Sequence, residues 1–169
     1  MGLLRPQRLY SSVTAIDVAE LTNLGIHALL LDVDNTLTPH GISALPADVA
    51  AWLDAVRSAG IRTVAVSNGK AGRIRPFMAS LGLECLPMAC KPLPIGFWRA
   101  QRRLRLKRRA CIAIGDQTFT DVLGAKLGGF RVWQTLPRVP EENMPFMALK
   151  RRWEARILRH VPVWDEGKR

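Results

Sequence analysis

Two carboxylates lie one residue apart in the sequence, directly after a short apolar run. Asp32 and Asp34 follow Ala28–Leu31, and Thr36 adds a hydroxyl two positions later. Two acids this close repel each other unless a cation lies between them, or unless one is a nucleophile while the other carries protons. The structural alternative for this stretch alone is a polar turn in which Asp34 or Asn35 caps a helix.

Further polar groups follow later apolar runs. Ser67 and Asn68 follow the second run, Lys91 precedes a proline, and Asp116 and Asp121 follow the fourth run. Taken singly, each group also fits an ordinary turn, a solvated lysine or a loop brace. Taken together, carboxylates, a hydroxyl and an ammonium are the residue types that handle phosphate, because phosphoryl transfer needs positioned donors and cations.

The elements that must position these residues follow from the hydrophobic pattern. Five apolar runs alternate with helical patterns, which predicts a parallel sheet covered by helices on both faces. The carboxyl ends of parallel strands share one edge, so we expect the polar groups to meet at one crevice. The expected strands are Ala28–Leu31, Ile61–Val66, Glu84–Met88, Ala110–Ile114 and Phe130–Thr135.

Carboxylates at such an edge suit Mg²⁺, a hard cation that prefers oxygen ligands and a substrate phosphate. We expect Asp32 and Asp116 to hold the ion, together with a backbone carbonyl near Asp34. For Asp121 two roles stay open, ligation of the ion through water and bracing of the loop.

The same residues predict a reaction on phosphomonoesters. Asp32 would attack phosphorus and form an aspartyl-phosphate, while Asp34 would give a proton to the leaving group and later take one from water. Ser67 and Lys91 would hold the phosphoryl oxygens, and Thr36 would steady the loop. His40 lies close to the acidic loop and is a further candidate for substrate contact.

In order along the chain, these groups resemble the four motifs of the haloacid dehalogenase (HAD) phosphatase superfamily. The matching runs are Leu31–Leu37, Val66–Asn68, Lys91-Pro92 and Ile114–Gly124, and the chain as a whole is similar to the YqeG subgroup of class IIIA phosphatases. The resemblance implies a three-layer α/β/α Rossmannoid fold, with a mainly parallel five-stranded sheet and no large cap domain, and it implies Mg²⁺. One departure is Gly69-Lys70, where relatives often carry a second asparagine.

The subgroup includes phosphatases that act on phosphatidylglycerophosphate, so the resemblance implies an anionic phospholipid headgroup as substrate. An uncapped site admits a phosphate presented by a large body. A soluble sugar phosphate, a nucleotide and a phosphoprotein remain alternative substrates. A non-enzymatic phosphoacceptor is less favoured, because Asp34 would speed loss of the phosphate from Asp32. A nucleic-acid binder is also less favoured, because the sequence carries no recognition motif for specific nucleic acid.

Length and composition set the remaining expectations. A chain of 169 residues is expected to form one domain, 1–169, with a short leader helix within residues 1–27. The 25 basic residues against 14 acidic ones predict an anionic partner. Three cysteines without zinc-like spacing favour a reducing compartment, and no signal peptide or long apolar run is found, so we expect a cytoplasmic protein.

The carboxyl-terminal stretch, residues 144–164, mixes apolar residues with basic ones. Met147, Leu149 and Trp153 alternate with Arg152 and Arg156 at helical spacing. This composition is typical of a helix that lies on an anionic membrane surface, which would make the protein peripheral on the inner face of the membrane. The alternative is a terminal helix packed on the core with its basic side in water.

Overall fold

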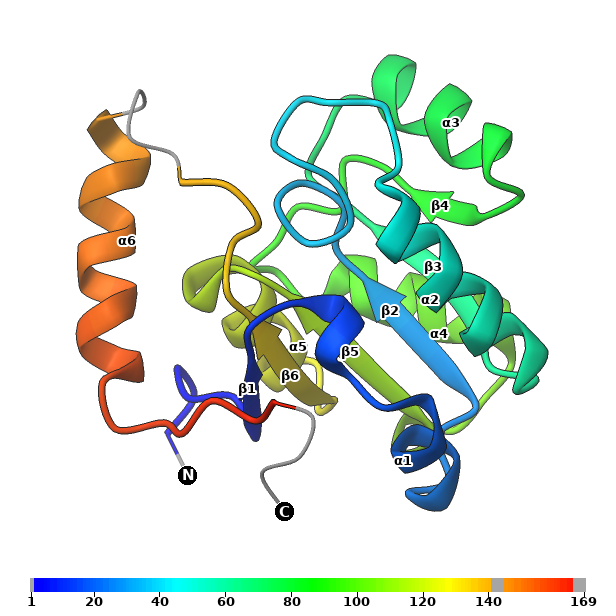
Figure 1. Ribbon diagram of the computed structural model, residues 1–169, viewed down its shortest axis with the longest axis horizontal. Coiled ribbons are helices and arrows are strands. Elements are labelled where there is room, and N and C mark those ends of the chain that lie inside the picture. The colour runs from blue at the N-terminus through cyan, green and yellow to red at the C-terminus, as the bar shows by residue number, and fades with distance from the viewer. Residues whose placement is uncertain (1, 141–144, 166–169) are drawn as a thin grey trace.

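The computed structural model describes residues 2–140 and 145–165, and within them six parallel strands form one sheet (Figure 1). The order is β1-β6-β5-β2-β3-β4. This architecture confirms the predicted parallel α/β fold, with one strand more than the five expected. The strands are β1 (Arg8–Tyr10), β2 (Ala28–Leu31), β3 (Arg62–Val66), β4 (Glu84–Leu86), β5 (Cys111–Gly115) and β6 (Arg131–Thr135).

The additional strand lies in the leader, which was expected to form only a helix. β1 pairs with β6, with Leu9 opposite Gln134, and Leu9 and Tyr10 are buried. Three residues are too few to show a strand period, so partners elsewhere in the chain determine this strand. The leader helix is α1 (Val18–Asn23), which begins where the carboxylate of Asp17 accepts a hydrogen bond from the amide of Ala19 at 2.8 Å.

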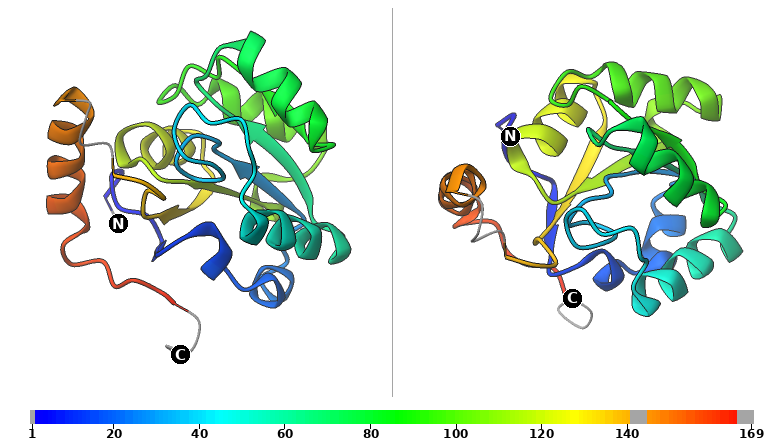
Figure 2. Two further views of the ribbon diagram at one scale, coloured as in Figure 1. Left: turned by 45° about the horizontal axis from the view of Figure 1, so that its top comes forward. Right: turned by 90° about the horizontal axis from the view of Figure 1, so that it is seen from above.

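Helices cover both faces of the sheet, as the continuous apolar strands require. On β2, Leu29 and Leu31 pack into one core cluster, while Ala28 and Leu30 pack into the cluster on the other face. The first face carries α1, α2 (Ala47–Ser58) and α3 (Ala71–Ser80), and the second carries α4 (Ile95–Leu104) and α5 (Leu123–Leu127), as Figure 2 shows from above. Within the described residues no cap domain interrupts this three-layer arrangement.

Register brings the ends of the central strands together. Leu31 at the end of β2 lies opposite Ile114 of β5 and Ala65 of β3. The ladder continues one step, since the amide of Asp32 donates to the carbonyl of Ile114 at 2.8 Å. The residues that follow β2, β3 and β5 therefore share one edge of the sheet.

The last helix, α6 (Pro145–Leu158), lies beside the β1–β6 side of the sheet (Figure 1). The expected helix, 144–164, began at Met144, which is outside the described residues, and it was expected to reach Trp164. Instead α6 ends at Leu158, because Pro162 cannot continue a helix. The chain then returns to the sheet, where the amide of Trp164 donates to the carbonyl of Leu9 and its ring stacks on the Arg8 guanidinium.

None of the helices in residues 2–140 and 145–165 has the length and apolar character needed to cross a bilayer.

Candidate active site

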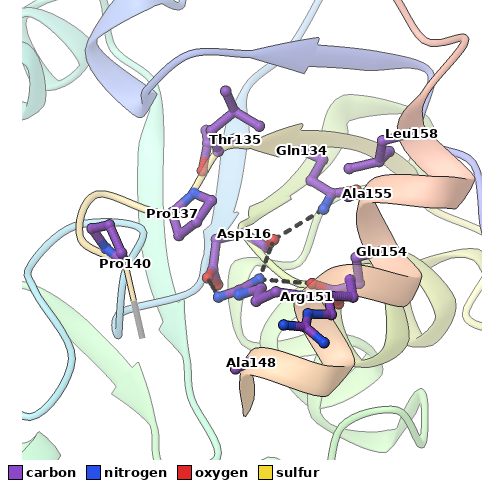
Figure 3. A pocket seen from close by; sticks show the side chains of 12 residues that line it. Asp116, Gln134, Thr135, Pro137, Pro140, Ala148, Arg151, Glu154, Ala155 and Leu158 are labelled. Atoms are coloured by element: carbon purple, nitrogen blue, oxygen red, sulfur yellow. Dashed lines mark hydrogen bonds and ion pairs between the residues drawn. The ribbon is translucent and has the colours of Figure 1, made fainter. Parts of the chain in front are cut away.

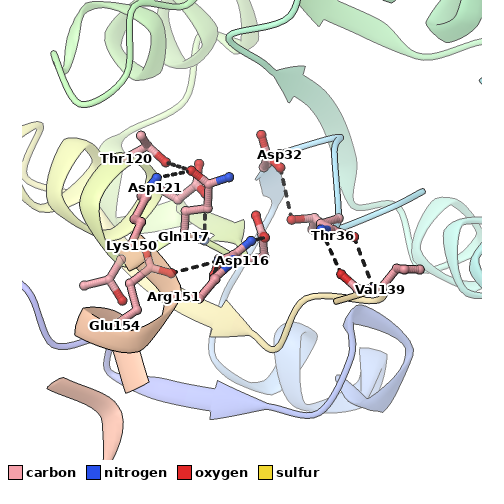
Figure 4. A network of polar contacts seen from close by, with 12 residues as sticks. Asp32, Thr36, Asp116, Gln117, Thr120, Asp121, Val139, Lys150, Arg151 and Glu154 are labelled. Carbon is pink, nitrogen blue, oxygen red and sulfur yellow. Dashed lines mark hydrogen bonds and ion pairs between the residues drawn. The ribbon is translucent and has the colours of Figure 1, made fainter. Parts of the chain in front are cut away.

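The side chain of Lys91 lies between two carboxylates at the shared edge of the sheet. Its Nζ donates to Oδ1 of Asp32 at 2.5 Å and to Oδ1 of Asp121 at 2.6 Å, and all three side chains are buried. The hydroxyl of Thr36 donates to the other oxygen of Asp32 at 3.1 Å (Figure 4). Residues that are distant in the sequence thus fix the direction of the Asp32 carboxylate.

Asp116 completes a cluster of three buried acids with Asp32 and Asp121. One carboxylate oxygen from each lies within 4.8 Å of the others. Gly115 makes this approach possible, because a Cβ at that position would lie 2.4 Å from Cγ of Asp121. The short π-helical turn at Thr118–Val122 then returns Asp121 to the cluster, where its Oδ2 accepts from the amide of Gln117 at 3.1 Å.

Asp34 lines the same crevice and is held by partners of its own. Its Oδ2 accepts a hydrogen bond from Nη2 of Arg73 at 2.5 Å, and its Oδ1 accepts one from the amide of Gly41 at 3.0 Å. Gly69 leaves the space for this contact, since a Cβ there would lie 2.7 Å from the same Arg73 nitrogen. The missing side chain at Gly69 therefore leaves room for the contact between Arg73 and Asp34.

The loop after β3 supplies the remaining predicted residues. Ser67 is buried, and its Oγ accepts from the amide of Gly69 at 2.9 Å. The side chain of Asn68 makes two hydrogen bonds to the main chain of Lys91, donating to its carbonyl at 2.9 Å and accepting from its amide at 2.8 Å. Asn68 thereby holds the backbone from which the Lys91 side chain extends.

A cavity of about 250 Å³ opens between these groups. The predicted residues Asp32, Asp34, Ser67, Asn68 and Lys91 line it, together with His40, Arg73 and neighbouring loop residues. The eight predicted site residues are thus brought to one edge of the sheet, and five of them line this cavity, while Thr36, Asp116 and Asp121 do not.

Burial and charge change the acidity of these groups. Burial raises the pKa of Asp32 to about 6 against the opposing effect of Lys91. Burial and the nearby charge of Asp32 also hold the pKa of Asp116 well above its usual range. Burial acts on Asp34 in the same direction, but the hydrogen bonds from Arg73 and Gly41 outweigh it and lower the pKa of Asp34. Burial disfavours the Lys91 ammonium, but Asp121 and Asp32 outweigh this effect and raise the pKa of Lys91, which stays charged.

The acidic cluster fits a hard divalent cation. Oδ1 of Asp116 is buried and has no hydrogen-bond partner among the described residues. Carboxylate oxygens of Asp32 and Asp121 lie within 4.8 Å of one of Asp116, and oxygen is the ligand atom that Mg²⁺ prefers.

Sequence reasoning missed the contribution of α6. Nη2 of Arg151 donates to Oδ2 of Asp116, and Nη1 donates to the carbonyl oxygen of Asp116 at 3.0 Å (Figure 3). The same helix places Lys150 against the side chain of Gln117. A cavity of about 610 Å³ lies between α6 and the end of β6, with Asp116 and Arg151 in its wall. A basic run carries no signal for which of its members turns inward, so only the fold identifies Arg151.

The sequence suggested Asn35 as a possible helix cap, and the structure gives it a different role. Its backbone is left-handed, with φ at 62°, and its side chain accepts from the amide of Val139 and donates to the carbonyl of Val139, both at 3.2 Å. Left-handed backbone is most accessible to asparagine among residues with a side chain. The pattern of a turn after Asp34 indicated such a residue, but not its distant partner.

Comparisons with known proteins find similarity to one family of hydrolases. A family model described as a haloacid dehalogenase-like hydrolase matches residues 41–129, more than half of the chain. The probable phosphatase YqeG of Bacillus subtilis (strain 168) is 29% identical over 153 residues, which cover 90% of this chain and 88% of that protein.

Solved structures share the fold at lower identity. The cobalt-bound deoxy-D-mannose-octulosonate 8-phosphate phosphatase of Haemophilus influenzae superposes with a TM-score of 0.57 at 14% identity, covering 80% of this chain and 89% of that one. CbbY from Rhodobacter sphaeroides, in complex with phosphate, gives a TM-score of 0.54 at 15% identity, covering 69% and 90%.

Proposed function

We propose a mechanism and a substrate from the premise that this chain belongs to the haloacid dehalogenase-like hydrolase family and is a phosphatase. In this proposal it hydrolyses phosphomonoesters with Mg²⁺, through a covalent phosphate on Asp32. The observation that supports it most is the meeting of Asp32, Lys91, Asp116 and Asp121 at one sheet edge, beside the cavity that Ser67 lines.

The first chemical step joins a carboxylate oxygen of Asp32 to phosphorus while the bond from phosphorus to the ester oxygen breaks. In this proposal Asp34 exchanges its contact with Arg73 for a proton when substrate binds, and gives that proton to the departing oxygen. In the second step water attacks the phosphorus, Asp34 takes the water proton, and the bond to Asp32 breaks to release inorganic phosphate. Asp34 lines the same cavity as Asp32, which suits a group that exchanges protons with the leaving oxygen.

Asp32, Asp116 and a backbone carbonyl near Asp34 would hold Mg²⁺ in this proposal. When bound, the ion supplies the positive charge that lets an anionic carboxylate approach an anionic phosphate. Lys91 would add a fixed charge beside the phosphoryl group. The Ser67 hydroxyl accepts from Gly69, which leaves its own hydrogen to donate to a phosphoryl oxygen.

For the substrate, we propose phosphatidylglycerophosphate at an anionic membrane surface. The absence of a cap domain in the described residues leaves the site accessible to a headgroup. On α6, Phe146 and Trp153 expose 79% and 54% of their surface, and Leu149 is also exposed. The exposed Arg152 and Arg156 lie beside them, and each basic residue near an anionic leaflet contributes about 1 kcal/mol.

A substrate panel tests this function. The purified chain with Mg²⁺ is given phosphatidylglycerophosphate in anionic vesicles, the same lipid in neutral vesicles, and glycerol 3-phosphate in solution. We expect the fastest release of phosphate from the anionic vesicles. Faster release of phosphate from the soluble ester would contradict the lipid as substrate. If no phosphomonoester released phosphate, the phosphatase proposal would be contradicted.

A further inference from the structure

We infer that Arg151 of α6 is a positioning residue for Asp116, so that the last helix sets the affinity of the site for its divalent cation. The inference rests on the proposed function, because it assumes that Asp116 is a ligand of the ion. It gives α6 a role in the site itself, separate from any contact between its outer face and a membrane.

Arg151 makes two hydrogen bonds to the same residue, Asp116. One guanidinium nitrogen donates to Oδ2 of Asp116, and the other donates to its main-chain carbonyl at 3.0 Å. Such a planar fork fixes the direction of a carboxylate as well as its place. The second carboxylate oxygen, Oδ1, is buried without a partner in the described chain and stays available to a cation.

Arg151 is itself held from its other side. Its Nη1 donates to Oε2 of Glu154 at 2.8 Å, and Glu154 is almost fully buried. The other oxygen of Glu154 accepts a hydrogen bond from the amide of Phe119 at 3.4 Å, in the loop that follows Asp116. Figures 3 and 4 show the contacts of Arg151 with Asp116 and Glu154. Together with the Phe119 contact, they fix α6 to the loop that follows β5.

A competing interpretation is that the guanidinium occupies the place of the cation. The hydrogen bond from Arg151 to the main-chain carbonyl of Asp116 argues against this second interpretation. It places the guanidinium beside the main chain, where it makes no hydrogen bond to Oδ1 of Asp116. The two interpretations predict opposite results for loss of Arg151. If Arg151 orients Asp116, its removal weakens cation binding, and if it replaces the cation, its removal strengthens binding.

Titration of the metal-free protein with Mg²⁺ by calorimetry decides between them. Loss of a residue that orients a metal ligand typically weakens metal binding by about 10- to 100-fold, so we expect this loss for Arg151→Gln. Arg152→Gln is the matched control, since it removes the same charge from the exposed neighbouring position, and it should bind Mg²⁺ like the wild type. Equal or tighter binding by Arg151→Gln overturns the inference.

A second variant covers the case in which Arg151→Gln does not fold. Arg151→Lys keeps the charge but cannot make the two-point contact, and we expect about tenfold weaker binding of Mg²⁺. Unchanged affinity in Arg151→Lys would overturn the inference by itself. Calorimetry measures Mg²⁺ binding without turnover, so this test does not depend on activity. A wild type that binds Mg²⁺ but hydrolyses no phosphomonoester would contradict the proposed function, and the comparison of Arg151 variants would still test the inference.

Discussion

The ammonium of Lys91 lies 2.5 Å from a carboxylate oxygen of Asp32, although 59 positions separate the two residues in the chain. Both are buried, and Lys91 also contacts Asp121 at 2.6 Å. A buried charge left without its partner is costly, so this contact links the stability of the fold to the composition of the site.

Replacement of Lys91 by methionine tests that link. We expect Lys91→Met to lower the free energy of unfolding of the metal-free protein by ~3–5 kcal/mol, because Asp32 and Asp121 lose their shared counter-charge. Urea unfolding measures the change. Lys70→Met at an exposed position is the control, and equal stability of the two variants would contradict the expected role of the buried pair.

Gly115 tests the packing behind the acidic cluster. A Cβ at this position would lie 2.4 Å from Cγ of Asp121, so Gly115→Ala must displace Asp121 from Lys91. We expect a loss of about 1–3 kcal/mol in stability and a large loss of phosphatase activity. Gly72→Ala, where a Cβ meets nothing within 4 Å, should be neutral or stabilising.

The strands of the sheet show which features the sequence predicts and which it does not. The apolar runs and the residues after them predicted the parallel sheet and placed Asp32, Ser67 and Asp116 at one edge, because strand direction alone determines that meeting. The local pattern does not predict β1, because its three residues form a strand only by pairing with β6.

The same limit applies to basic residues at the site. Arg73 and Arg151 stand in charged stretches that fit a solvated helix face. Their contacts with Asp34 and Asp116 depend on how α3 and α6 pack, and on the missing side chain at Gly69. Individual inward-facing arginines therefore become identifiable only when the fold is known.

The raised pKa of Asp32 predicts a pH dependence of stability in the metal-free protein. Its folded pKa is about 6 and its ordinary value is 3.8, so the folded state binds more protons than the unfolded state between these values. Stability that Asp32 contributes is then lost as the pH rises from about 4 to 6. Other groups titrate as well, so the measured quantity is the difference in unfolding free energy between wild type and Asp32→Asn.

As the pH rises from about 4 to 6, the unfolding free energy of the wild type should fall relative to that of Asp32→Asn. Mg²⁺ should make this fall smaller, because a cation favours the ionised carboxylate. A difference that stays constant with pH in the metal-free protein would contradict the raised pKa.

Arg73 is expected to control the acidity of Asp34. Burial alone raises the pKa of Asp34, and the Arg73 hydrogen bond is the main effect that lowers it. Arg73→Gln should therefore raise the pKa of Asp34, as read by carboxyl NMR titration. Arg75→Gln, exposed on the same helix, should leave that pKa unchanged, and an unchanged value in both variants would contradict the assignment.

The most direct test of the proposed mechanism is the rate of phosphate release from phosphatidylglycerophosphate in anionic vesicles with Mg²⁺, measured for Asp32→Asn beside Asp54→Asn. Asp54 is exposed and contacts Arg57 on the surface, so its variant should keep the wild-type rate. We expect Asp32→Asn to lose at least about 10³-fold, because the amide cannot form the acyl-phosphate. An Asp32→Asn variant as active as Asp54→Asn would contradict the mechanism.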